Sequence, residues 1–250
     1  DICYFEVYLR KIKQVIGERP INYLIINHME PDHSGSIRLI KQHYPEIIIV
    51  GNKQTFGMIE GFYGVTGEQY LVKEGDFLAL GHHKLRFYMT PMVHWPETMM
   101  TFDETDGVLL SGDGFGCFGT VDGGFLDTRI NVDKYWGEMV RYYSNIVGKY
   151  GSPVQKALQK LGGLPISAIC STHGPVWTEN IAKVIGIYDR LSRYDADEGV
   201  VIAYGSMYGN TEQMAEAIAE ELSAQGVKNI VMHNVTKSHP SYIIADIFRY

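Results

Sequence analysis

The sequence predicts an α/β protein made of two domains. Apolar runs of strand length alternate with helical patterns along the 250 residues. A polar and acidic stretch, "RYDADEG" at 193–199, interrupts this alternation after a long helix. The pattern then restarts as strand, loop, helix, strand and helix. We therefore predict a first domain over residues 1–195 and a second over residues 199–250.

The first domain begins with a helical pattern over residues 4–16, followed by the buried strand "YLII" at 23–26. The stretch "SGSIRLIKQHY" predicts a helix, with Ser34 as its N-cap and Pro45 beyond its end. A second buried strand, "IIIVG" at 47–51, precedes a short helix in "KQTFGMIEGFYG". Two strands and two helices thus alternate here, as an α/β layer requires.

The middle of the chain predicts two hairpins, because "FLALGHHKLRFYMT" and "TMMTFDETDGVLLSG" each alternate around a turn that contains glycine. Residues 114–128 are rich in glycine and irregular, which is typical of a loop near a site. Helical patterns follow over residues 133–148 and 152–161. The strand "ISAICS" and the strongly periodic helix in "TENIAKVIGIYDRLSRY" complete the first domain.

Composition excludes several functions. The formal net charge of −7 argues against nucleic-acid binding, which usually requires a basic face. No apolar run approaches the length of a membrane span, and no signal peptide pattern is present. The three cysteines lie far apart without C-x-x-C spacing, so neither a disulfide framework nor a cysteine metal site is predicted. A reducing cytoplasm is the expected compartment.

One short stretch concentrates candidate metal ligands. "NHMEPDHSGS" at 27–36 places two histidines and two acids directly after a buried strand, and further candidates follow three later strands. Loops beyond strand ends converge at one edge of layered α/β folds, so we expect these side chains to meet. A polar turn would explain the first stretch but not the later series. Seven ligands exceed one tetrahedral zinc site and suit two metals if one carboxylate bridges. The seven candidates are His28, Glu30, Asp32, His33, His94, Asp113 and His173.

A second motif, "VVIAYGSMYGNTEQMAEAIAEEL", predicts a buried strand, a polar loop and an amphipathic helix. Backbone N–H groups of such a loop and the helix N-terminus behind it form an anion site. The loop lacks the lysine of a P-loop and the G-x-G-x-x-G order of a dinucleotide site. A capped strand–helix turn is the alternative interpretation. The candidate binding residues are Ser206, Met207, Tyr208, Gly209, Asn210 and Thr211.

These motifs resemble a known family. The order H-x-[EH]-x-D-H, then His, Asp and His at long spacings, resembles the metallo-β-lactamase-like proteins, whose hydrolases usually have histidine where Glu30 stands. The strings "NHMEPDHSGS", "HWPETM", "GDGFG" and "HGPVW" resemble the flavodiiron proteins, over nearly the whole chain. The resemblance implies a metallo-β-lactamase-like αββα sandwich followed by a flavodoxin-like doubly wound parallel sheet. Two parallel strands cannot bury both faces of a sheet, so we expect the second domain to be truncated. The first domain begins inside a helical pattern, so we expect its N-terminal part to be missing.

The resemblance also implies roles for the candidate residues. A carboxylate in place of the usual imidazole at Glu30 favours iron. Tyr143 would donate a hydrogen bond to bound substrate, with ordinary helix packing as the alternative, and Trp95 would pack beside the site. The loop at 206–211 would hold the FMN phosphate, whereas the loops that hold the flavin ring would lie beyond residue 250. One iron would be bound by His28, Glu30 and His94, the other by Asp32, His33 and His173, with Asp113 as the bridge.

The function implied by the resemblance is reduction of O2 to water, of NO to N2O, or of both, at two non-haem irons that receive electrons through FMN. The electron donor would be rubredoxin, a flavin reductase or a deazaflavin cofactor, and the assembly a head-to-tail homodimer or a tetramer. The alternative is a dizinc hydrolase whose metal-bound hydroxide attacks an ester or amide. Glu30 and the phosphate loop argue against it. A third possibility is an electron carrier with a structural metal site.

Overall fold

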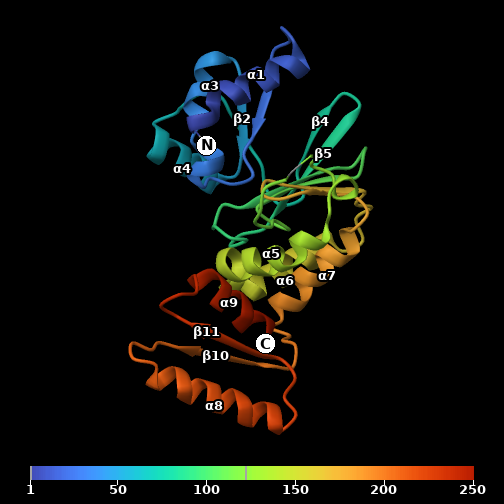
Figure 1. Cartoon of the computed structure of the whole chain (residues 1–250). Helices are drawn as coiled ribbons and strands as arrows, with labels where there is room; N and C mark the ends of the chain where they lie inside the picture. Colours follow the sequence, from blue (N-terminus) through green and yellow to red (C-terminus); the bar gives the residue numbers. More distant parts are fainter. Residues whose placement is uncertain (1, 122) are drawn as a thin grey trace. The chain divides into compact units, whose positions relative to one another are not determined.

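The computed structural model describes residues 2–121 and 123–250, and the chain packs into two units (Figure 1). The first unit comprises Asp1–Gly114 and Lys160–Cys170, and the second comprises Phe115–Gln159 and Ser171–Tyr250. Both units contain helices and strands, which confirms the α/β class. No helix in the described part of the chain combines the length and apolarity needed to cross a membrane.

A parallel sheet with helices on one face forms the first layers of unit one. Its strands β1 (Tyr23–Ile25), β2 (Ile48–Gly51) and β3 (Gln69–Leu71) pair in that order. The helices are α1 (Phe5–Ile16), α3 (Ile37–His43) and α4 (Lys53–Tyr63). Ile49 of β2 packs with Ile37 and Phe56 in one buried cluster, and Ile47 packs with Phe5 of α1 in another. The sequence analysis missed β3, because its three residues are exposed and form no apolar run.

The two predicted hairpins are confirmed and build a second sheet in unit one. Val50 of β2 points to the opposite side from Ile49, where it packs with Phe87 and Met99 of this second sheet. Side chains alternate between the two faces of the first sheet along β2. One face therefore packs against the helices and the other against the second sheet. The sheet runs in the order β4 (Phe77–Leu80), β5 (His83–Met89), β6 (Met99–Asp103), β7 (Val108–Gly112) and β8 (Ala168–Ser171), with antiparallel pairing from β4 to β7.

The helix predicted in "SGSIRLIKQHY" is confirmed as α3, but Ser34 as its N-cap was wrong. Ser34 is the last residue of the short helix α2 (Pro31–Ser34), and α3 begins only at Ile37. The Ser34 hydroxyl donates to the carbonyl oxygen of Met29 at 2.7 Å instead of capping α3. A serine before an apolar run favours a cap in sequence, but here Pro31 starts a helix three residues earlier.

Unit two contains the glycine-rich loop, a group of helices and the C-terminal parallel strands. Its principal helices before residue 195 are α5 (Asp133–Tyr142), the π-helical η3 (Tyr143–Val147), α6 (Gly151–Leu161) and α7 (Ile181–Ser192). The later elements are β10 (Val200–Tyr204), α8 (Asn210–Ala224), β11 (Ile230–Asn234) and α9 (Pro240–Arg249). Strands β10 and β11 pair in parallel, and Figure 1 shows α8 and α9 on opposite faces of this pair.

The last helix packs on α5 through one arginine. The Arg141 guanidinium lies 4.5 Å from the ring centre of Phe118 and 4.7 Å from that of Tyr242. It also donates to the Ser241 hydroxyl at 3.0 Å. Arginine prefers such stacked positions because its planar cation is weakly hydrated. The parallel strands and α9 are therefore attached to the helices that precede residue 195.

Candidate metal centre

Strand ends bring most of the candidate ligands to one edge of unit one. Strands β5 and β7 run in the same direction, because both are antiparallel to β6. The loop after β5 carries His94, and Asp113 directly follows β7. His28 and Glu30 lie in the loop after β1, and Asp32 and His33 lie in α2.

Asn27 ties the end of β1 to the second sheet and so places His28. Its amide nitrogen donates to the carbonyl oxygen of Leu110 in β7 at 3.0 Å, and its side-chain oxygen accepts from the Thr101 hydroxyl in β6 at 2.7 Å. The backbone oxygen of Asn27 accepts from the N–H of Met99 at 3.0 Å. These three hydrogen bonds fix the residue that precedes the first candidate ligand.

Four candidate side chains converge on one point. The Nε2 atom of His94 lies 3.1 Å from Glu30 Oε2 and 3.2 Å from Asp113 Oδ2. The Nε2 atom of His28 lies 3.4 Å from the same Glu30 oxygen and 3.6 Å from the same Asp113 oxygen. All four donor atoms lie within 4.8 Å of one another. Two imidazole nitrogens and two carboxylate oxygens at this spacing can surround one metal ion.

The other oxygen of Asp113 faces a second group of ligands. Asp113 Oδ1 lies 2.9 Å from His33 Nε2, and the same His33 atom lies 3.3 Å from Asp32 Oδ2. The Asp113 side chain is only 2% exposed, so its charge needs partners on both sides. One buried carboxylate thus divides its two oxygens between two sets of histidines, which is the arrangement of a bridging ligand.

The carboxylates raise the pKa of two of the candidate imidazoles, those of His33 and His94. Burial alone would lower the pKa of His33, but its hydrogen bond to Asp113 and the charges of Asp113, Asp32 and Glu30 raise it above its ordinary value. Burial likewise opposes a charged His94, and Asp113 and Glu30 again raise the pKa. These shifts reflect a strongly negative environment, which attracts metal cations as well as protons.

His173, the seventh candidate, belongs to unit two, and its metal role stays a prediction. It lies just beyond β8, where its carbonyl oxygen accepts from the N–H of Cys117 at 3.2 Å. The following residue, Gly174, has a φ of +87°, and a Cβ there would collide with the Cys117 sulfur. Burial raises the pKa of the Cys117 thiol to about 12, so this cysteine is a packed neighbour of the loop and no thiolate ligand.

Tyr143 lies in the interior of unit two. It is fully buried, and its ring lies 5.0 Å from that of Tyr188 and 6.2 Å from that of Phe248. Burial raises the pKa of its hydroxyl. The neighbouring Tyr142 has its ring 5.7 Å from that of His173. Helix packing therefore accounts for the contacts of Tyr143, and its catalytic role stays a prediction. A tyrosine pair in a helix gives no sign in the sequence of which ring faces a ligand.

The phosphate-loop candidates lie between β10 and α8. Gly209 precedes α8 with a φ of +88°, and its N–H donates to the Ser206 hydroxyl at 3.0 Å. Met207 and Tyr208 are each 85% exposed, and Asn210 is the first residue of the helix. The loop thus lies at the N-terminus of a fifteen-residue helix with its side chains open to solvent. Its part in FMN binding stays a prediction.

The sequence analysis missed Glu97, which is fully buried beside His28. Burial opposes its ionisation, but hydrogen bonds from His28, from its own backbone and from Met29 lower its pKa below the ordinary value. Glu97 stands in "HWPETM", three residues after His94. Nothing in its spacing separates it from an exposed acid, so only the packing of this loop identifies it. Trp95 of the same loop packs beside His28, as expected, with ring centres 5.4 Å apart.

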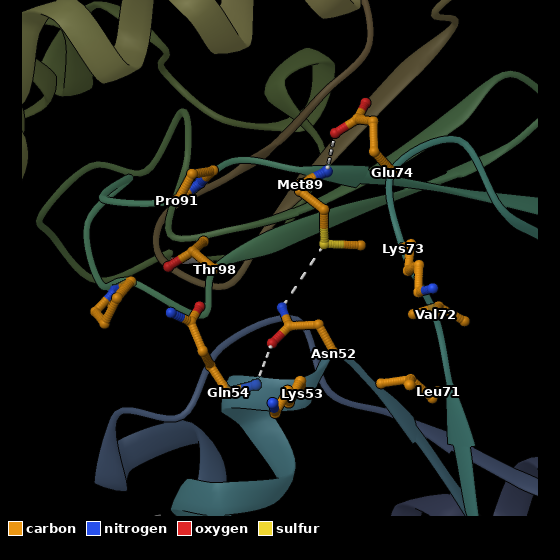
Figure 2. A pocket seen from close by; sticks show the side chains of 11 residues that line it. Asn52, Lys53, Gln54, Leu71, Val72, Lys73, Glu74, Met89, Pro91 and Thr98 are labelled. Carbon is orange, nitrogen blue, oxygen red and sulfur yellow. Dashed lines mark hydrogen bonds between the residues drawn. The ribbon is translucent and has the colours of Figure 1, made fainter.

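Residues of the same loop also line a pocket (Figure 2). Its volume is about 470 Å³, and Pro91, Pro96 and Thr98 of the loop contribute to its wall. Figure 2 shows Asn52 at its base, where the side chain reaches toward Met89 and caps α4. Asn52 accepts from the N–H groups of Gln54 and Thr55 and donates to the carbonyl oxygen of Glu97 at 2.6 Å. One side chain therefore joins the start of α4 to the loop of the metal centre.

Replacing Asn52 by alanine is expected to lower the free energy of unfolding by about 1 kcal/mol, because α4 loses its N-cap. Urea unfolding of the metal-free chain measures this loss. Asn52→Ser is the matched control, since its hydroxyl keeps an acceptor oxygen for the helix and lacks the donor to Glu97. Equal destabilisation by both variants would show that the cap is not the source of the effect.

The chain was compared with known proteins. Residues 2–174 match the model of the ODP family beta lactamases, and residues 202–249 match the flavodoxin model. The anaerobic nitric oxide reductase flavorubredoxin of Escherichia coli O1:K1 is 30% identical over 254 aligned positions, which cover 100% of this chain and 53% of that protein. The chain spans about half the length of the curated relatives that it matches. The two family matches leave residues 175–201 between them, so the predicted boundary near 195–199 falls in this interval and stays a prediction.

Solved structures of related proteins have the same fold. Rubredoxin oxygen:oxidoreductase from Desulfovibrio gigas superposes with a TM-score of 0.91 at 28% identity, covering 96% of this chain and 61% of that one. The flavodiiron protein from Giardia intestinalis gives a TM-score of 0.92 at 26% identity, covering 97% and 60%. Fold and ligand cluster together define a metallo-β-lactamase-like metal domain followed by a flavodoxin-like segment. The chain belongs to the ODP family of β-lactamase-like proteins and, within it, to the flavodiiron proteins.

Proposed function

We propose that this chain carries the catalytic metal centre of a flavodiiron oxidoreductase. The observation that supports this most directly is the placement of Asp113, whose two buried oxygens face different histidines at 2.9 Å and 3.2 Å. A hydrolytic site with one metal has no use for a carboxylate shared in this way. Two metal ions joined by one bridge account for it.

The donor set fits two iron ions. His28, Glu30 and His94 would hold one, Asp32, His33 and His173 would hold the other, and Asp113 would join them. The oxygen of Glu30 at the position where hydrolases of this fold have imidazole makes the set harder and favours iron. When bound, the iron pair supplies the electrons and the open coordination positions that reduction of a small gas molecule requires. The protein side chains would hold this pair in a partly buried, negatively charged site.

The flavodoxin-like segment would supply the electron entry. The loop over Ser206–Thr211 would hold the FMN phosphate at the N-terminus of α8, where backbone N–H groups and the helix dipole favour an anion. The family match over residues 202–249 supports this assignment. The names of the relatives support O2 or NO as substrate and rubredoxin as one electron donor, with a flavin reductase as another candidate. We further propose a head-to-tail homodimer or tetramer in the cytoplasm.

The dizinc hydrolase is less well supported, because two of the relatives are named as a nitric oxide reductase and an oxygen:oxidoreductase. A test separates the two functions directly. The chain is reconstituted anaerobically with iron, its metal content is measured, and consumption of O2 and of NO is followed with a chemical reductant that reduces the metals directly. The proposal expects about two irons per chain and turnover of at least one gas. Two zinc ions that resist exchange for iron, with ester or lactam hydrolysis and no gas consumption, would overturn it.

A further inference from the structure

Glu97 is a buried acid that contacts a proposed metal ligand without being one itself. Its side chain is 0% exposed, and its Oε1 atom lies 2.8 Å from His28 Nδ1. The same oxygen accepts from the N–H of Met29 at 2.8 Å. Glu97 therefore holds both the ring of His28 and the backbone beside it.

The contact with Glu97 leaves the other ring nitrogen of His28 facing the metal centre. Nδ1 is directed at Glu97, whereas Nε2 is directed at Glu30 and Asp113 at 3.4 Å and 3.6 Å. A neutral imidazole carries one N–H, and a carboxylate acceptor at Nδ1 keeps that hydrogen there. Nε2 then presents its lone pair to the point where the four donors converge. An outer carboxylate commonly fixes a metal-bound histidine in this way.

Only one oxygen of the Glu97 carboxylate has hydrogen-bond partners that stabilise it. The second oxygen of Glu97 is buried and has no hydrogen-bond partner among residues 2–121 and 123–250. A buried charge that is only partly satisfied costs free energy, and an apolar side chain of similar size is often no less stable. The backbone of Glu97 is held separately, because its carbonyl oxygen accepts from Asn52. This hydrogen bond remains when the carboxylate is removed.

We propose that Glu97 is a positioning residue, which fixes His28 in the tautomer and ring orientation that present Nε2 to the metal. This inference rests on the metal centre proposed above, but its test needs no turnover. The probe is Zn²⁺, which binds histidine and carboxylate sites and gives sharp NMR spectra. The readouts are the Zn²⁺ affinity of the 250-residue chain, from chelator competition, and the ring ¹⁵N and N–H signals of His28.

Glu97→Leu removes the acceptor and is expected to weaken Zn²⁺ binding about 10- to 100-fold, the usual range for loss of an outer carboxylate. The slowly exchanging Nδ1–H signal of His28 should disappear in this variant. Glu97→Gln keeps a neutral acceptor at the same position. It should retain the signal at a shifted frequency and bind Zn²⁺ with an affinity between those of the wild type and the leucine variant.

Asp103→Asn is the matched control, because Asp103 lies 2.7 Å from His83 Nδ1 in the same unit. It removes the charge from a similar acid–histidine pair and should leave the His28 signals unchanged. If Glu97→Leu does not fold, as judged by thermal unfolding of the metal-free chain, Glu97→Gln decides. A folded variant that binds Zn²⁺ with wild-type affinity and shows an unshifted His28 signal would overturn the role of Glu97. This outcome would leave the proposed metal centre standing. A wild-type chain whose His28 and His94 signals ignore Zn²⁺ would overturn the metal centre as well.

Discussion

Replacing Asp113 by alanine is expected to reduce the iron content from about two ions per chain to one or none and to abolish gas reduction. Asp113 is the only carboxylate in unit one's described residues whose two oxygens lie within hydrogen-bonding distance of His33 on one side and His94 on the other. Its loss removes the one carboxylate that His33 shares with His28 and His94, which keep only Glu30 in common. Turnover should fall by more than about 100-fold, the upper end for loss of an outer partner, because Asp113 would be a direct ligand.

Iron analysis and anaerobic O2 and NO consumption measure both effects on the same sample. Asp103→Ala serves as the control, since this acid pairs with His83 outside the proposed centre. Asp113→Asn tests the charge, because it keeps the shape of the side chain and lowers its affinity for metal. An alanine variant that retains two irons and turns over at the wild-type rate would refute the bridging role.

Replacing Asp127 by alanine is expected to lower the free energy of unfolding by about 3 kcal/mol or more. Asp127 is 3% exposed, and its carboxylate accepts from the N–H groups of Thr178, Glu179 and Asn180. It also accepts from the Thr178 hydroxyl at 2.6 Å. Without the carboxylate, these donors remain in place and lose their acceptor. Urea unfolding of the metal-free chain measures the effect.

Asp133→Ala is the control for this variant, because Asp133 is exposed at the start of α5. It should change the free energy of unfolding by no more than about 0.5 kcal/mol.

The hydrogen bonds of Asp127 also predict how stability depends on pH. Burial opposes its ionisation, but the hydrogen bonds from Thr178 and Asn180 lower its pKa below the ordinary 3.8.

A lowered pKa in the folded state means that the unfolded chain binds the proton more readily. The contribution of Asp127 is therefore fully present above the ordinary pKa and is lost as the pH falls through the lower, folded pKa. Between about pH 5 and pH 2 the wild type should lose more stability than Asp127→Asn, which has no charge to titrate. Parallel stability curves for the two proteins in this range would contradict the assignment.

The sequence determined the local structure wherever one element could be recognised from its own residues. The runs "YLII" and "IIIVG", the two hairpins and the periodic helix before residue 193 follow from apolar spacing and turn residues alone. Four candidate metal ligands could also be recognised from one short stretch of sequence. They stand within six positions after a strand and are His28, Glu30, Asp32 and His33. Strand β3 was missed because Gln69, Tyr70 and Leu71 are exposed and belong to a sheet only through pairing with β2.

The tertiary structure decided what each polar group does. Glu97 and Glu104 are both acids near strands of the same sheet, yet only Glu97 is buried against a ligand. The two oxygens of Asp113 acquire different partners only when the ends of β1 and β7 meet through Asn27. Local sequence sets conformation because it acts through neighbouring residues. Roles at a site depend on which distant loops pack together and shield a charge from water, and that is decided by the whole fold.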